Sequence, residues 1–144
     1  MKVTLAKTAG FCFGVQRAVD TVYRVLEEER RKPDGKQRTI FTYGPIVHNE
    51  TVIQKLAAEG VRVIESEDEL TTLRDGIVII RAHGVPKRIY ELLKEQRVEA
   101  VDASCPFVQK IQRLVQQHTS AGEQVFVTGN PAHPEVIGIM GWAE

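Results

Sequence analysis

The stretch GIVIIRAHGVPK, residues 76–87, decides the fold of this chain. Its first half, Gly76 to Arg81, is an unbroken apolar run ending in a charge, which is typical of a strand buried on both faces of a sheet. Pro86 then opens a segment with helical spacing, and a strand followed closely by a helix is the repeating unit of parallel sheets. The stretch therefore predicts one βα unit with a histidine, His83, at its turn.

The same alternation of β-branched runs and helical segments continues along the whole chain. Further strands are expected at 2–7, 39–43, 61–64, 98–102 and 124–128. Helices are expected at 14–30 and 49–59, in a short turn at 66–70, and in segments opened by Pro86, Pro106 and Pro134. This order predicts an α/β fold made of parallel-sheet βα units. The helix from Pro106 is expected to face inward with Phe107, Ile111, Leu114 and Val115.

The composition limits the classes of function. The chain has 144 residues, 42% hydrophobic and 26% charged, which suits one globular domain or one domain plus part of a second. Nineteen basic and nineteen acidic residues cancel, so neither a nucleic-acid footprint nor an anionic membrane surface is expected as partner. There is no apolar run of about 18 residues and no secretory signal at the start, so a cytoplasmic location is expected.

The chain has two cysteines, Cys12 and Cys105, and neither belongs to a C-x-x-C pair. In a reducing cytoplasm they are expected to be thiols or metal ligands rather than a disulfide. The plainer interpretation is that both are small buried hydrophobic residues. Whether they are metal ligands or core residues depends on where they lie relative to the expected strands and helices.

Cysteines and histidines gather at the strand-to-helix junctions. Five of the six expected junctions carry one, in the order Cys12, His48, His83, Cys105, His133. Because the carboxyl ends of parallel strands meet at one edge of a sheet, these side chains are expected to share a cleft there. Singly, each has a structural alternative: a cysteine can be core, and a histidine can cap a helix or lie on the surface.

The expected cleft is electropositive. Helix amino-termini point free N–H groups into it, which suits a phosphate anion and favours the thiolate form of cysteine. Glu135, in the first turn after His133, is the expected acid, although the helix dipole alone could explain it. His118 lies within a helix and is interpreted as structural. There is no G-x-G-x-x-G and no Walker motif, so a nucleotide cofactor is not indicated.

Five segments together resemble one family: AKTAGFCFGVQRAV, TYGPIVHN, RAHGVP, VDASCPFV and HPEVIGIMG. In this order they are similar to the 4-hydroxy-3-methylbut-2-enyl diphosphate reductase family, and the resemblance runs from Lys2 to Gly141. It implies three similar α/β domains around a cavity that holds a [4Fe-4S] cluster. Residues 1–105 would form the first domain and residues 106–144 would begin the second.

The resemblance also implies roles for single residues. Cys12 and Cys105 match the first two of three cluster ligands, and His48, His83 and His133 match the histidines that bind the substrate diphosphate. Glu135 matches the proton donor. The implied reaction is reductive dehydroxylation of the allylic diphosphate to isopentenyl and dimethylallyl diphosphate, with a ferredoxin or flavodoxin as electron donor. The third cysteine would lie beyond Glu144, so the chain alone is expected to be inactive.

Two other functions are compatible with the same residues. Cys12, Cys105 and one or two histidines could hold zinc tetrahedrally without redox chemistry. Alternatively, the chain could be an anion-binding α/β module in which ligand binding requires the histidines and does not require the cysteines.

Overall fold

The computed structural model describes residues 1–143, and its centre is a parallel sheet of four strands in the order β2-β1-β3-β4. The strands are β1 (Ile40–Tyr43), β2 (Arg62–Ile64), β3 (Ile77–Ile80) and β4 (Glu99–Asp102). All four residues of β3 are buried, as its unbroken apolar run predicts. The expected parallel α/β fold is confirmed.

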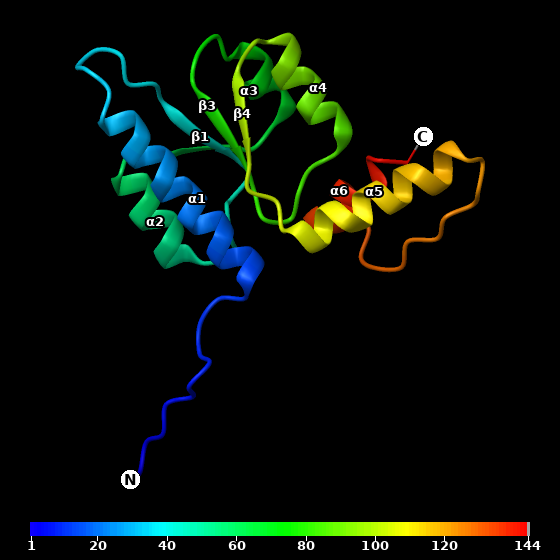
Figure 1. The fold of residues 1–144 in the computed structure, drawn as a ribbon, viewed down its shortest axis with the longest axis horizontal. Helices are drawn as coiled ribbons and strands as arrows, with labels where there is room; N and C mark the ends of the chain where they lie inside the picture. Colours follow the sequence, from blue (N-terminus) through cyan, green and yellow to red (C-terminus); the bar gives the residue numbers. More distant parts are fainter. Residues whose placement is uncertain (144) are drawn as a thin grey trace.

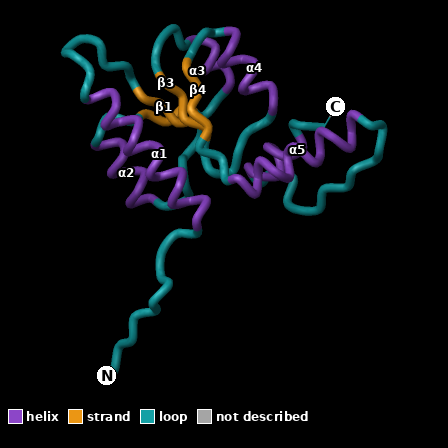
Figure 2. The backbone as a smooth tube through the Cα atoms, viewed as in Figure 1, coloured by secondary structure: helices purple, strands orange, loops and turns teal. Residues whose placement is uncertain are grey.

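Helices cover both faces of this sheet (Figures 1 and 2). One face carries α1 (Phe13–Arg30) and α2 (Glu50–Ala58); the other carries α3 (Glu67–Thr72) and α4 (Lys87–Glu95). A hydrophobic core lies on each face of the sheet, and alternate residues of β3 pack into one core or the other, because successive side chains of a strand point to opposite faces. Ile77 and Ile79 pack with α1 and α2, whereas Val78 and Ile80 pack with α4.

Two further helices lie beyond β4. The helix α5 (Pro106–Ser120) leads away from the sheet, and α6 (Pro134–Met140) returns beside it (Figure 1). The chain after α6 is fixed to the turn that follows β3: the Lys87 N–H donates to the carbonyl of Gly141 (3.1 Å), and the indole N–H of Trp142 donates to the carbonyl of Val85 (2.9 Å). These bonds hold the end of α6 against the turn between β3 and α4.

Two expected strands are wrong. Residues 1–12 form no strand, residues 1–13 are exposed, and the segment leads away from the body of the molecule (Figure 1). Residues 124–128 also form no strand and follow α5 as a loop. A β-branched run becomes a strand only when another strand satisfies its backbone groups, and neither segment has such a neighbour in the part of the chain that is described.

The helix predicted from Pro106 is confirmed, but its predicted inward face is mostly wrong. Val108, Gln112 and Val115 are buried, whereas Phe107 is 70% exposed. Ile111 and Leu114 are also exposed. The contact with the turn after β3 sets the orientation of α5, since Gln112 donates to the carbonyl of Val85 (3.4 Å).

The edge of the sheet where β1 begins is held by a buried carboxylate. Glu29, 4% exposed, accepts hydrogen bonds from the backbone N–H (2.9 Å) and the guanidinium (2.9 Å) of Arg38 and from Lys32 Nζ (2.6 Å). The hydrogen bond from the Arg38 side chain is the main cause that lowers the pKa of Glu29 to about 2, against the opposing effect of burial. This network joins the end of α1 to the strand β1.

No helix within residues 1–143 has the length and apolar character needed to cross a membrane.

Candidate functional site

The turns that follow β1, β3 and β4 are joined by main-chain hydrogen bonds. The Cys105 N–H donates to the carbonyl of Ala82 (2.9 Å), and the Ala82 N–H lies 3.5 Å from the carbonyl of Ile46. These bonds hold the loops of His48, His83 and Cys105 beside one another at the carboxyl edge of the sheet, where ligands bind in α/β proteins.

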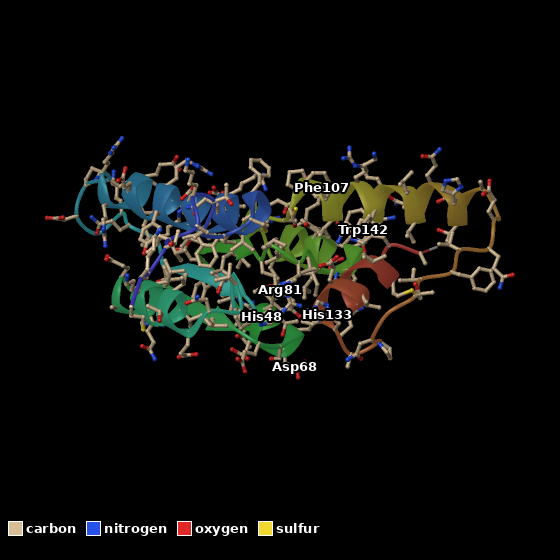
Figure 3. All side chains as sticks on the ribbon, turned by 90° about the horizontal axis from the view of Figure 1, so that it is seen from below. His48, Asp68, Arg81, Phe107, His133 and Trp142 are labelled. Carbon is tan, nitrogen blue, oxygen red and sulfur yellow. The ribbon has the colours of Figure 1, made fainter. Side chains whose placement is uncertain are left out.

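Three imidazoles form a row at this edge. The ring centroids of His48 and His83 are 4.8 Å apart, and those of His83 and His133 are 5.7 Å apart with the rings at 83°. Figure 3 shows His48 and His133 in the same region of the molecule, together with Arg81. The structure therefore brings together three histidines that are separated by up to 85 positions in the sequence.

His83 is the central member and the most constrained. Burial lowers its pKa to about 4, and electrostatic interactions with His48, Arg81 and His133 act in the same direction. Its ring is thus neutral at physiological pH, with one N–H donor and one acceptor nitrogen. Its Nδ1 atom is buried without a hydrogen-bond partner. A buried polar atom without a partner is costly, and a ligand at the site would relieve that cost.

Of the two flanking histidines, His133 is oriented by the helix that it precedes, whereas His48 is not. His133 is the N-cap of α6, and its Nδ1 accepts a hydrogen bond from the Glu135 N–H (3.2 Å). Because Nδ1 acts as an acceptor here, we assign the ring proton of His133 to Nε2, where it is available to a ligand. Asn49, rather than His48, caps α2 by accepting from the Val52 N–H (3.1 Å). His48 is therefore not needed as a cap.

The two thiols lie at the starts of two neighbouring helices. Cys12 is the N-cap of α1 and Cys105 is the N-cap of α5, and neither side chain caps its helix by a hydrogen bond. Both are free cysteines. The start of α1 packs on the Cys105 loop, because the Arg17 guanidinium donates to the carbonyl of Ser104 (2.6 Å) and Gly14 lies directly against the Cys105 side chain.

A hydrogen-bond network that the sequence did not reveal shapes the turn before Cys105. The carboxylate of Asp102, at the end of β4, accepts from the Ser104 N–H (2.8 Å), Gln109 Nε2 (3.0 Å) and the Tyr90 hydroxyl (3.1 Å). Burial raises the pKa of the Tyr90 phenol, which keeps it a donor. The D-x-S spacing before Cys105, in which an acid bonds its own backbone two residues on, was the available signal.

Glu135 and His118 occupy other places. Glu135 follows His133 by two residues and is one of the residues that line a groove between α5, residues 125–128 and α6. His118 is paired with Glu123 (2.7 Å) on the exposed side of α5, which agrees with its structural interpretation. The histidine row therefore contains three of the four histidines of the chain.

The zinc alternative receives no support from the geometry. Among residues 1–143, no three side chains of His, Cys, Asp or Glu are grouped so that they could hold a metal ion. Cys12 and Cys105 are both free and stand at the amino-termini of two helices, which suits two thiol ligands of an iron–sulfur cluster.

Arg81 is a site residue that the sequence interpretation missed. It follows β3 directly, two residues before His83, and is half-buried. A charged residue at the end of an entirely apolar strand was the signal that could have found it.

Fold and site together define an α/β protein that places imidazoles and thiols at one edge of a parallel sheet. Residues 3–144 match a family described as "LytB protein". The 4-hydroxy-3-methylbut-2-enyl diphosphate reductase of Alkaliphilus oremlandii is 45% identical over 144 residues, 100% of this chain and 48% of that protein. The reductase of the same name from Thermoanaerobacter sp. strain X514 is 46% identical over 145 residues, with the same coverage.

Solved structures agree. A structure described as the terminal enzyme of the non-mevalonate pathway, (E)-4-hydroxy-3-methyl-but-2-enyl diphosphate reductase, has a TM-score of 0.78 at 36% identity, covering 97% of this chain and 46% of the other. The reductase from Plasmodium falciparum has a TM-score of 0.82 at 33% identity, covering 95% and 40%. The chain belongs to the LytB family and spans about half the length of the curated relatives that it matches.

Proposed function

We propose that this chain supplies the diphosphate-binding histidines and two cluster ligands of a 4-hydroxy-3-methylbut-2-enyl diphosphate reductase. The observation that carries the proposal is the row of His48, His83 and His133 beside the loop of Cys105, on which the start of α1 packs. Membership of the LytB family and relatives of that name support it.

In this proposal the histidines bind the substrate diphosphate. His83 is neutral because its pKa is about 4, so it can donate one hydrogen bond to phosphate without first being protonated. His133 offers Nε2–H because its Nδ1 is engaged with the Glu135 N–H. Three donors from separate loops would fix the anion in one orientation, which is how an enzyme positions an allylic group for reaction.

The thiols would hold the cofactor. Cys12 and Cys105 would be two of the ligands of a [4Fe-4S] cluster, which supplies two electrons when bound. Overall, the allylic C–O bond breaks, the hydroxyl group leaves as water, and two electrons and two protons are consumed. Glu135 would supply a proton to the substrate. The electrons would come from a ferredoxin or flavodoxin, and the cytoplasm is the proposed location.

The domain organisation is also part of the proposal. Residues 1–105 would form the first of three similar α/β domains, and residues 106–144 would begin the second. The remaining substrate-binding residues and a third cysteine would belong to the rest of the reductase, so we expect no turnover from these 144 residues alone.

The diphosphate site can be tested with inorganic pyrophosphate by isothermal titration calorimetry. We expect the 144-residue chain to bind it and His83→Gln to bind about tenfold more weakly, which corresponds to one charge-assisted hydrogen bond. His118→Gln, which changes a histidine outside the row, is the matched control and should bind like the unmodified chain. Equal binding by His83→Gln and His118→Gln would contradict the proposal.

The thiol assignment has its own test. After anaerobic reconstitution with iron and sulfide, we expect broad absorption at about 400 nm from thiolate-bound iron. Cys12→Ser and Cys105→Ser should each lose this absorption while still binding pyrophosphate. A colourless chain that retains stoichiometric zinc would instead favour the zinc alternative, and unchanged colour in both serine variants would exclude these ligands.

A further inference from the structure

Arg81 differs from Arg38 and Arg88 because no carboxylate neutralises its charge within residues 1–143. Arg38 is paired with Glu29 and Glu99, and Arg88 is paired with Glu67. Arg81 makes no ion pair within residues 1–143, and its Nε atom is buried without a hydrogen-bond partner. Arg38 Nε is also buried without a partner, but the charge of Arg38 is neutralised by its two carboxylates. A half-buried guanidinium without an anion is unfavourable, so the fold retains here a charge that it does not neutralise.

Within residues 1–143, no side chain near Arg81 can supply the missing negative charge. Burial lowers the pKa of Arg81, and only Tyr43 opposes this effect. Burial in turn raises the pKa of Tyr43, so its phenol stays protonated and uncharged. The carboxylate of Glu67 is engaged by Arg88, both through Nε (2.9 Å) and through Nη2.

The guanidinium of Arg81 lies over Gly44, which has no side chain to obstruct it. A Cβ carbon added to Gly44 would lie 2.3 Å from Arg81 Nη1 and 3.1 Å from its Cζ. The side chain of Arg81 therefore occupies the space over Gly44, which begins the loop that leads to His48 and has a φ of +70° that favours glycine. Arg81 also lies close enough to His83 to lower the pKa of His83.

Two polar atoms without partners thus belong to one short loop: Arg81 Nε and His83 Nδ1. The neutral imidazole of His83 provides hydrogen bonds but no charge, whereas an arginine is always charged and suits phosphate oxygens. We propose that Arg81 is a further anion-binding residue, which supplies the fixed positive charge for the diphosphate that the histidine row binds. This inference rests on the proposed function of that row.

The test compares Arg81 with a matched arginine. Arg88 also acts on Tyr43 electrostatically, but its charge is satisfied by Glu67. We expect Arg81→Met to bind inorganic pyrophosphate about tenfold or more weakly than the unmodified 144-residue chain, Arg81→Lys to retain most of the affinity, and Arg88→Met to be unchanged. Circular dichroism and the fluorescence of Trp142 check that each variant is folded; if Arg81→Met is not, Arg81→Gln replaces it.

The outcomes separate the two proposals. If the unmodified chain binds pyrophosphate and the folded Arg81 variants bind it equally well, the inference is overturned while the histidine site stands. If Arg81→Met and Arg88→Met weaken binding alike, a general loss of positive charge explains the effect and the inference also fails. If the unmodified chain does not bind pyrophosphate, the proposed diphosphate site is wrong and this inference falls with it.

Discussion

Gly14 lies directly against Cys105: a Cβ carbon added to Gly14 would be 2.5 Å from Cys105 Sγ and 2.9 Å from Cys105 Cβ. The second residue of α1 therefore sets the position of a thiol at the start of α5. Because Cys12 is the residue that caps α1, this contact relates the two proposed cluster ligands to each other.

Gly14→Ala should destabilise the protein by about 1–3 kcal/mol, because the added methyl group overpacks the Cys105 side chain. In an open helix the same change would be stabilising, since alanine has the higher helix propensity. Urea denaturation measures the difference. Gln16→Ala, an exposed position two residues further on, should stay within about 0.5 kcal/mol of the unmodified chain. A stability gain in Gly14→Ala would show that Cys105 moves aside freely.

Stability should depend on His83 between pH 6.5 and 4. The folded-state pKa is lowered to about 4 from an ordinary value of 6.5, chiefly by burial, so the unfolded chain binds more protons in this window. The contribution of His83 to the free energy of unfolding is therefore fully present above pH 6.5 and declines until the pH reaches about 4. Denaturation series at several pH values should show a weaker dependence in His83→Gln. Identical pH profiles would contradict the assignment.

Glu29 acts in a lower pH window. Its pKa is lowered from 4.5 to about 2, mainly by the Arg38 hydrogen bond, so its contribution to stability is present above pH 4.5 and is lost as the pH falls through about 2. Glu29→Gln should cost about 3 kcal/mol at pH 7, because it leaves Arg38 and Lys32 without their buried carboxylate. Glu28→Gln removes an exposed ion pair on the same helix and should cost less than about 1 kcal/mol.

Gly141→Ala should weaken pyrophosphate binding through the position of α6. A Cβ carbon at Gly141 would be 2.3 Å from Pro86 Cβ, so the end of α6 would move away from the turn after β3 and take His133 with it. The fluorescence of Trp142, the one tryptophan of the chain, should report this displacement. Met140→Ala changes an exposed neighbour and should bind normally. Unchanged affinity in Gly141→Ala would show that His133 does not depend on this contact.

The central sheet was predictable because local pattern and tertiary environment agree there. The apolar run before Arg81 forms β3, and Ser66 and Pro106 begin helices as their residue types predict. The segments 2–7 and 124–128 have the same local pattern, yet strand formation also needs a pairing partner, which the local pattern of a segment does not specify. The face of α5 was mistaken for a related reason: Gln112 is buried by its bond to Val85, a contact 27 positions away.

The sequence predicted which strand-to-helix junctions carry the histidines of the site, but not the partners of each side chain. In a parallel sheet, topology brings strand ends together, which is why the loops of His48 and His83 meet as expected. His133 follows a segment that forms no strand, and it reaches the row because the end of α6 is fixed to the turn after β3. The roles of Arg81 and Asp102 depend on which partners each side chain has, and that information exists only in the folded chain. Arg81 matters because it lacks a carboxylate, and Asp102 matters because it has several donors.

The amide and carbonyl groups that join Cys105, Ala82 and Ile46 belong to the backbone and carry no side-chain identity. The spacing of the loops is thus largely independent of which residues the loops display. Replacing an imidazole or a thiol by another polar group would change what the edge can bind while leaving its architecture in place. A few substitutions in these loops would therefore give the same backbone scaffold a different set of binding side chains. Such a scaffold is suitable for the design of a new binding site.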